Sequence, residues 1–352
     1  VTPLALPSAA SGAAHPMRQR LAEVDALRGV AALAVVLYHY TTRFQEVFSP
    51  TTAPTIAFTH GHYGVNLFFI ISGFVIFMTL LRTTRPLDFV VSRFSRLFPA
   101  YWVSIALTLA ITHALGLPDK LVSAGTALAN VFMLHGLAGV AHVDGVYWTL
   151  EVELLFYFGM FALYRLRLLE QIHLMLALLV GLRLLYFATA QFAGIDLSWT
   201  VSRLLILQYI PWFSIGVAIY LHIAPRNETD KRQSIWLAGF AAFALTVADS
   251  ITEGLLAGVL ATAVYLAASG RAGVLKHPAL VWLGSISYPL YLLHENIGWS
   301  ILLRALAAGV PFDAAVALTL AASLTLAALV SRTVEQPVMR WIRDRYRARQ
   351  LA

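Results

Sequence analysis

The sequence contains no cysteine at any of its 352 positions. This absence excludes disulfide bonds, thiolate metal ligands and a cysteine nucleophile or acyl carrier. Charged residues are also scarce, at 12% of the chain, where soluble domains carry about 25%. Hydrophobic residues make up 59% of the chain, and the mean hydropathy is +0.73. This composition excludes an ordinary soluble protein and is typical of a protein that crosses a membrane many times.

Ten apolar stretches are long enough to cross a membrane as helices. They lie near residues 25–46, 61–81, 97–115, 146–164, 171–190, 203–223, 234–250, 254–269, 281–305 and 312–331. The stretch 121–140 is less apolar, so it is either an eleventh span or a re-entrant segment. We therefore predict an all-α polytopic membrane protein with about ten transmembrane helices and an additional short or re-entrant segment near 121–140.

The basic residues favour ten spans over eleven. With ten spans and a cytoplasmic N-terminus, all but six of the 25 lysines and arginines lie on the cytoplasmic side, as the positive-inside rule requires. The exceptions are Arg28, Arg43, Lys120, Arg183, Arg203 and Arg304. An eleventh span would reverse every later loop. The net charge of +7 therefore indicates topology and contact with anionic membrane lipid, not binding to nucleic acid, and both termini are predicted to be cytoplasmic.

The predicted domain organisation is simple. Residues 1–20 are rich in alanine, serine and proline, which indicates a disordered N-terminal tail. Residues 21–345 form a single transmembrane domain, and residues 346–352 form a short basic cytoplasmic tail.

The first span carries ionisable residues, which cost roughly 2–3 kcal/mol each inside a membrane. Asp25, Arg28 and His39 all lie in DALRGVAALAVVLYHY (25–40). Arg28 and His39 are 11 residues apart, close to three helical turns, so they share one stripe about 16 Å apart. One interpretation is a polar cleft along this stripe. The other is that His39 caps the outer interface while Asp25 and Arg28 pair at the inner one.

Five later segments follow in a fixed order: GVNLFFIISGFVI (64–76), RFSRLFPAYW (93–102), WTLEVELLFYFGM (148–160), LGSISYPLYLLHENIG (283–298) and EQP (335–337). Together with the first span they resemble the membrane acyltransferase-3 family, the bacterial acyl-CoA-dependent O-acyltransferases. The resemblance covers about residues 20–345. It departs from the family pattern at Asn66, at Pro289 and at Glu295-Asn296.

The resemblance implies roles for individual residues. His39 matches the catalytic histidine, with Arg28 as its partner. Arg93 and Arg96 match an Arg-x-x-Arg motif associated with the acyl-CoA donor. Further positions are implied as substrate contacts or structural support: Ser72, Trp148, Tyr157, His294 and Glu335.

The residues themselves agree with this chemistry. Histidine is the natural base for a hydroxyl at neutral pH, and a carboxylate would hold its second nitrogen. We expect Glu153 to do so, with Asp25 as the second candidate; the alternative is that Glu153 pairs with Arg28. Arg93 and Arg96 lie three residues apart and would present two guanidiniums to phosphates. The alternative is that they are ordinary positive-inside anchors.

Several residues have two interpretations. Ser72 is expected to serve packing or hydrogen bonding. Trp148 fits either an interfacial aromatic belt or a sugar-stacking surface. His294 is either an acceptor contact or a core or interface histidine, and Glu335 is expected to close the last span. We predict no metal and no tightly bound cofactor.

The predicted function is that of an enzyme of the bacterial cytoplasmic (inner) membrane. It would move an acyl group, with acetyl preferred, from cytoplasmic acyl-CoA to a hydroxyl of a cell-surface or lipid-linked glycan. Two alternatives stay open: a small molecule or membrane lipid as the acceptor, and a glycan transporter or flippase without acyl chemistry. An acyl-His39 intermediate and direct transfer in a ternary complex are both compatible with the sequence.

Overall fold

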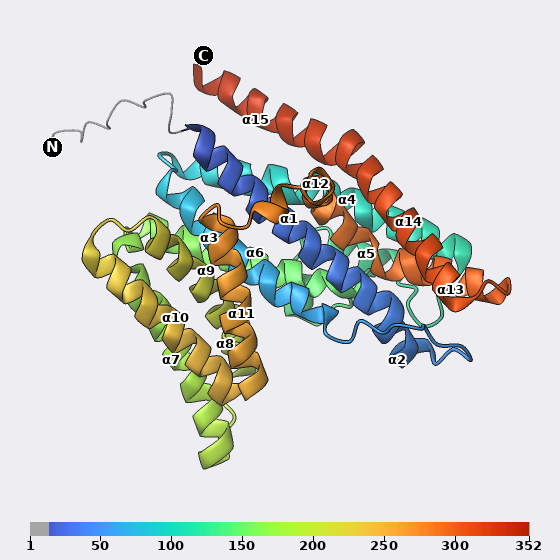
Figure 1. Cartoon of the computed structure of the whole chain (residues 1–352), viewed down its shortest axis with the longest axis horizontal. Helices are drawn as coiled ribbons and strands as arrows, with labels where there is room; N and C mark the ends of the chain where they lie inside the picture. The colour runs from blue at the N-terminus through green and yellow to red at the C-terminus, as the bar shows by residue number, and fades with distance from the viewer. Residues whose placement is uncertain (1–13, 352) are drawn as a thin grey trace.

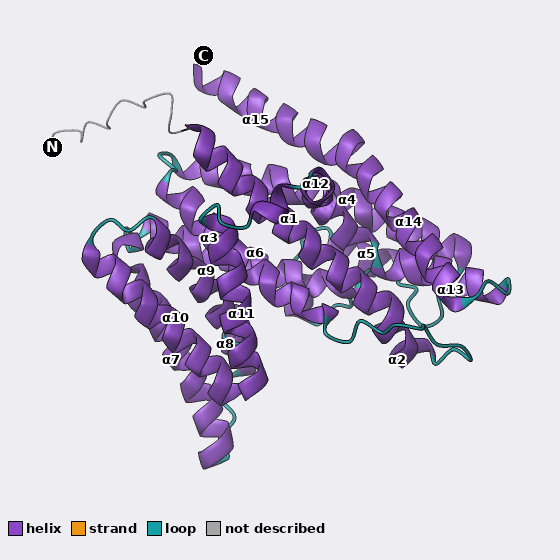
Figure 2. Ribbon diagram, in the orientation of Figure 1, coloured by secondary structure: helices purple, strands orange, loops and turns teal. Residues whose placement is uncertain are grey.

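The computed structural model describes residues 14–351, and in this range helices alternate with loops and no strand is present (Figures 1 and 2). The helices are, in chain order, α1 (Ala14–Tyr38), α2 (Phe44–Phe48), α3 (Gly64–Leu81), α4 (Pro86–Leu115), α5 (Ala124–Asn130), α6 (Trp148–Arg165), α7 (Ile172–Ala188), α8 (Trp199–Leu204), α9 (Ile210–Ile223), α10 (Glu228–Ala248), α11 (Ile251–Ala268), α12 (Pro278–Leu293), α13 (Glu295–Ala307), α14 (Phe312–Val330) and α15 (Gln336–Leu351). The predicted all-α membrane fold is confirmed.

Six of the ten predicted spans form helices that are long and apolar enough to cross a membrane, counted over the described residues. They are Gly61–Leu81, Pro86–Leu115, Gly145–Arg165, Leu169–Ala193, Ile251–Ala268 and Phe312–Gln350. The apolar helices α9 and α12 are shorter. The chain is therefore a multi-pass membrane protein, and the total of ten spans stays a prediction.

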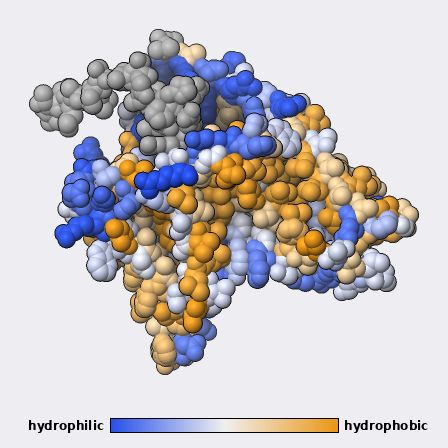
Figure 3. Space-filling model, in the orientation of Figure 1, coloured by the Kyte–Doolittle hydropathy of each residue, from blue (hydrophilic) through white to orange (hydrophobic). Residues whose placement is uncertain are grey.

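The outer surface agrees with a lipid environment. Helices α7, α10 and α11 carry exposed Leu174, Phe243 and Leu255, which lie 55–70% open. Figure 3 shows a hydrophobic face across this side of the molecule, with hydrophilic residues gathered above it. Such a face is stable against lipid tails and unfavourable in water.

The helices form a centre with two flanks (Figure 1). α1, α3, α4, α6 and α12 make up the centre, α7 to α11 lie on one side, and α13 to α15 lie on the other. α1 and α12 approach closely at Gly29 and Gly284, where a Cβ atom on Gly29 would lie 2.5 Å from Gly284 N. Small residues allow such backbone contact in a membrane, where packing replaces the hydrophobic effect.

The segment near 121–140 forms α5 and a single 3₁₀ turn, His135–Ala138. Neither is long enough to cross a membrane. This outcome agrees with the predicted short segment.

The predicted span 281–305 is wrong as a single helix, because the structure divides it into α12 and α13 at His294. Helix α12 contains Pro289, which lacks an N–H for the helix ladder. The start of α13 is capped from outside, since Asn296 N donates to Asp144 Oδ2 at 3.0 Å. This cap satisfies a backbone donor that a helix start otherwise leaves free.

Glu335 was expected to close the last span; the helix itself continues past this residue, and the membrane boundary stays a prediction. The helix runs from α14 through a π-helical turn, Ser331–Glu335, directly into α15. This wider turn precedes Pro337 and accommodates its missing N–H donor, so the helix continues.

The two predicted tails have different outcomes. Residues 1–13 of the predicted N-terminal tail lie outside the described residues, and residues 14–20 form the first turns of α1. Residues 346–351 of the predicted basic tail continue α15.

Candidate functional site

Two cavities adjoin each other in the centre of the molecule. The arginine cavity, of about 740 Å³, is lined by Arg28, Arg93 and Arg96, among others. The histidine cavity, of about 1050 Å³, is lined by His39 and Glu295, among others. Both include Val65, Phe69 and Tyr291 in their walls, so these three side chains separate one cavity from the other.

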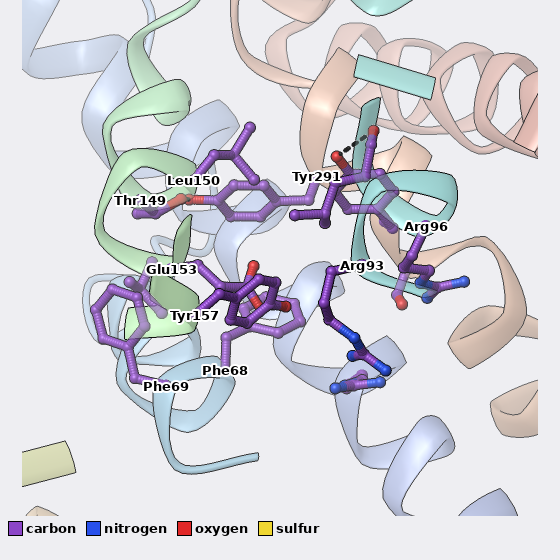
Figure 4. A pocket seen from close by; sticks show the side chains of 14 residues that line it. Phe68, Phe69, Arg93, Arg96, Thr149, Leu150, Glu153, Tyr157 and Tyr291 are labelled. Atoms are coloured by element: carbon purple, nitrogen blue, oxygen red, sulfur yellow. Dashed lines mark hydrogen bonds between the residues drawn. The ribbon is translucent and has the colours of Figure 1, made fainter. Parts of the chain in front are cut away.

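The arginine cavity gathers side chains from α1, α3, α4, α6 and α12. Figure 4 shows Arg93 and Arg96 on α4 across from Glu153 and Tyr157 on α6. The structure therefore brings Arg28 together with Arg93 and Arg96, whereas His39 lines the neighbouring cavity. Asp25 is more than half exposed and lies 3.4 Å from Arg28.

Arg93 and Arg96 have different partners. Arg96 Nη1 lies 2.7 Å from Glu335 Oε1, and Glu335 is 1% exposed. Arg93 Nη2 donates to the neutral hydroxyls of Ser92 at 3.2 Å and Thr79 at 3.4 Å. Its guanidinium carbon also lies 5.9 Å from the centre of the Tyr157 ring. Arg93 thus keeps its positive charge available to an anionic group in the cavity.

Glu153 does not hold His39, contrary to the expectation from the sequence. Its Oε1 accepts hydrogen bonds from Ser72 Oγ at 2.8 Å and from Tyr157 Oη at 2.5 Å. Both donors are neutral hydroxyls. The alternative, an ion pair between Glu153 and Arg28, is also not found among the described residues. The difference arises because Glu153 lines the arginine cavity, one compartment away from His39.

His39 begins a π-helical turn, His39–Arg43, directly after α1. Its Nδ1 lies 2.9 Å from the Val35 carbonyl oxygen and 3.2 Å from His294 Nε2. A carbonyl only accepts, so the proton is on Nδ1 and the lone pair is on Nε2. The backbone therefore provides the orientation that the sequence suggested for a carboxylate.

His294 supports this assignment. Its Nδ1 lies 2.8 Å from the Tyr291 carbonyl, so its Nε2 is free to accept from His39. The side chain is completely buried, and Tyr40 Oη donates to the His294 carbonyl at 2.8 Å. His294 thus lies behind His39, in the wall of the site, and a direct acceptor contact is not favoured by this placement.

Glu295 is the carboxylate next to His39. Its Oε2 lies 3.6 Å from His39 Nε2, and its side chain is 8% exposed. Gly145 packs against it, since a Cβ atom there would lie 2.4 Å from Glu295 Oε1. The break before α13 places Glu295 at this point, and the Asp144 cap holds the break in position.

Asp144 lies in the loop before α6 and is completely buried. Burial raises the pKa of its carboxyl, while the N–H groups of Asn296 and Val146 oppose this rise. The loop is also tied to α13 by Asn296 Nδ2, which donates to the Val143 carbonyl at 2.9 Å.

The remaining predicted residues fall in both compartments. Trp148 lines the histidine cavity, and Tyr157 lines the arginine cavity. Ser72 is 3% exposed and supports Glu153 by a hydrogen bond. Glu335 forms an ion pair with Arg96. This pairing favours structural support over a contact with the acceptor.

Sequence reasoning missed one residue of the site and one contact near it. Glu295 was noted only as a departure from the family pattern, although its neighbour His294 was singled out. Arg343 of α15 contacts α4, where its Nε donates to Ser95 Oγ at 3.1 Å and its Nη2 to the Ser92 carbonyl at 3.2 Å. The spacing of residues in the sequence contains no signal for this contact between α15 and α4.

Comparison with known proteins gives several matches. The family described as "Acyltransferase domain" matches residues 21–332. Exopolysaccharide production protein ExoZ of Rhizobium meliloti (strain 1021) is 30% identical over 253 residues, which cover 67% of this chain and 76% of that protein.

Two further relatives match over shorter regions. Nodulation protein 10 of Rhizobium leguminosarum bv. viciae is 35% identical over 27% of this chain and 30% of its own length. Peptidoglycan O-acetyltransferase OatA of Listeria monocytogenes is 26% identical over 48% of this chain and 28% of its own length. No solved structure matches the chain.

Proposed function

This chain belongs to the acyltransferase family that its motifs predicted, and on that premise we propose that it transfers an acyl group, with acetyl preferred, from acyl-CoA to a hydroxyl of a cell-surface or lipid-linked glycan. The acceptor class is supported by relatives named for exopolysaccharide production and for peptidoglycan O-acetylation.

One observation carries the proposal: a cavity rich in arginine adjoins a cavity with an oriented histidine. Arg93 has neutral hydroxyl partners, and a guanidinium binds phosphate oxygens strongly. Arg28 and Arg96 line the same space. In this proposal the nucleotide phosphates of acyl-CoA bind near these arginines, and the pantetheine arm carries the thioester past Tyr291 toward His39.

The transfer step uses the free nitrogen of His39. The acceptor hydroxyl gives its proton to Nε2 while its oxygen attacks the thioester carbonyl. The resulting tetrahedral oxyanion collapses, the C–S bond breaks, and the CoA sulfur leaves with the proton from His39. Glu295, 3.6 Å away, would stabilise the imidazolium between these two proton transfers. Both substrates meet in one complex in this sequence of steps.

The sidedness follows the distribution of basic residues. The arginine cavity is assigned to the cytoplasmic side and the histidine cavity to the opposite side, with both termini cytoplasmic. Acyl-CoA would then bind from the cytosol, and the glycan would be modified on the other face of the membrane.

The test uses purified full-length protein in lipid nanodiscs with radiolabelled acetyl-CoA and a glucose or N-acetylglucosamine tetrasaccharide as the acceptor. CoA release and labelled product are measured together. His39→Ala is expected to lose at least about a hundredfold in transfer rate and to keep CoA binding. The double variant Arg93→Ala/Arg96→Ala is expected to lose CoA binding.

His113→Ala serves as the matched control, because His113 is exposed on α4 and lines neither cavity. Equal behaviour of wild type and all variants, or no turnover with any acyl-CoA, would contradict the proposal. A transporter or flippase would then be the better hypothesis.

A further inference from the structure

A third hollow, which we call the tryptophan groove, opens beside the histidine cavity. It measures about 740 Å³, and its walls include Trp148, Glu151, Trp199, Arg203, Gln208 and Tyr209. Trp148 and Tyr209 also line the histidine cavity. The groove therefore adjoins the histidine cavity, with these two aromatic side chains between them.

We propose that the tryptophan groove binds an uncharged hexose ring of the acceptor, adjacent to the ring whose hydroxyl reacts at His39. This inference rests on the proposed function, because it takes His39 as the point of transfer. It adds a binding subsite and a preference for neutral sugars.

Three aromatic side chains line the groove: Trp148, Trp199 and Tyr209. The ring centres of Trp148 and Tyr209 lie 5.2 Å apart, where the groove meets the histidine cavity. Trp199 on α8 is 65% exposed. The C–H face of a pyranose ring packs well on such flat apolar surfaces, and its hydroxyls remain at the edge for hydrogen bonding.

A buried ion pair supplies the polar part. Arg203 donates through Nε and Nη2 to Glu151 Oε1, at 3.1 and 2.8 Å. The guanidinium carbon also lies 4.9 Å from the centre of the Trp199 ring, so the two side chains of α8 are in cation–π contact. Because the two charges cancel, this wall favours neutral sugars over uronic or sialic acids.

Glu151 has an unused acceptor. The residue is 2% exposed, and its Oε2 accepts no hydrogen bond from any described residue. Gly136 packs against this oxygen, so the carboxylate faces the wall and the groove is met by the Arg203 guanidinium that the carboxylate holds.

The turn directly after α8 is held in a costly conformation. Ile206 has a φ of 48°, in the left-handed region that β-branched residues rarely adopt. Buried Arg183 stabilises this turn, because it donates to the Leu207 carbonyl at 3.3 Å and pairs with Asp249. Strain maintained in this way is common at binding sites.

An interfacial aromatic belt would explain an exposed Trp199 alone, since such rings lie at the membrane surface. It would not explain the ion pair beside the ring or the strained turn that follows Arg203. Trp236 on α10 is the matched belt residue, because it is 79% exposed and lies outside the groove.

The experiment measures acceptor dependence with the full-length protein in nanodiscs. The probes are cellotetraose and chitotetraose, which are neutral, and tetragalacturonate, which is anionic. Binding is followed by calorimetry and transfer by CoA release from acetyl-CoA. Hydrolysis of acetyl-CoA without an acceptor reports the donor side separately.

Trp199→Ala is expected to weaken binding of the preferred neutral tetrasaccharide about tenfold and to raise its KM equally, while kcat and donor hydrolysis stay within about twofold. Trp199→Phe is expected to restore most of the affinity. Trp236→Ala is expected to match wild type. Arg203→Gln is also expected to weaken the binding of the neutral probes.

Each outcome is decisive for the groove. The proposed sugar subsite would be overturned if Trp199→Ala kept the wild-type affinity or if Trp236→Ala lost as much affinity as Trp199→Ala. It would also be overturned if wild type preferred tetragalacturonate or bound none of the probes. If wild type binds a neutral probe through Trp199 but shows neither hydrolysis nor transfer, the groove stands and the proposed enzyme activity fails.

Discussion

The arginine cavity and the histidine cavity share three wall residues, yet they hold their ionisable groups in different ways. In the first, Arg93 is surrounded by hydroxyls and aromatic rings and forms no ion pair with a described residue, although Glu153 lines the same cavity. In the second, His39 is fixed by a backbone carbonyl and a second histidine. A permanent cation suits the binding of an anion, whereas a neutral base in one orientation suits proton transfer.

The largest effect should distinguish the two carboxylates of the site. Glu295→Gln keeps the shape of the side chain but removes the charge beside His39 Nε2, so the imidazolium formed during transfer loses its stabilisation. We expect kcat to fall about a hundredfold. Glu153→Gln, in the other cavity, should lower kcat only about threefold, because a neutral amide oxygen still accepts from Ser72 and Tyr157. Single-turnover transfer measures both, and the reverse order would contradict the assignment of Glu295.

A second test concerns the two arginines, which the sequence treats as equivalent. Arg96→Met leaves Glu335 buried without its cation, and we expect a loss of about 2 kcal/mol in the free energy of unfolding, reduced because Arg96 is partly exposed. Adding Glu335→Gln should recover most of that loss. Thermal unfolding in nanodiscs measures the cycle. Additive losses in the double variant would show that the pair is not coupled.

Arg93 should show the opposite pattern. Arg93→Gln removes a guanidinium whose hydrogen-bond partners are neutral, so the unfolding temperature should change little. The affinity for CoA should fall about tenfold, the value of one charge-assisted contact to phosphate. Titration of CoA with and without its 3′-phosphate measures the loss. If Arg93→Gln destabilises the protein as much as Arg96→Met, the two arginines have the same structural role.

The long apolar helices could be predicted from the sequence, because the position of a long apolar run depends on local composition alone. The break at His294 could not be read in this way. The run 281–305 is continuous in composition, and the break is stabilised by Asp144, which is far away in the chain. Such a cap is visible only when the loop before α6 and the start of α13 are seen together.

The motif singled out His39, but it did not single out the carboxylate that lies beside it. Glu153 is the conspicuous acid inside an apolar span, so it was the natural choice. Its distance from His39 depends on how α6 is placed against α1, which the sequence does not contain. Glu295 reaches His39 only because of the break at His294, so an error in the helix led directly to an error in the site.

The smallest effect should come from acid, and it should act on two histidines beside the tryptophan groove. His135 and His142 lie beside the tryptophan groove, with their ring nitrogens 2.7 Å apart, and Glu151 and Arg203 face them. Burial lowers the pKa of His135 to about 4 and also lowers the pKa of His142. An unfolded histidine has a pKa near 6.5, so between about pH 6.5 and 4 the unfolded chain binds more protons than the folded one. Stability should therefore fall as the pH drops through this window and stay constant above it.

His135→Asn removes one of these protonation sites, so its unfolding temperature should depend less on pH than that of wild type. We expect a difference of roughly 2 °C between the two at pH 5, after matching them at pH 7.5. His113→Asn is the matched control, since His113 is exposed and away from the groove. The arginines of the other cavity remain charged throughout this range, so their contacts should not respond. An identical pH dependence in wild type and His135→Asn would show that acid sensitivity arises elsewhere, and the contrast between the two cavities would then rest on their charges alone.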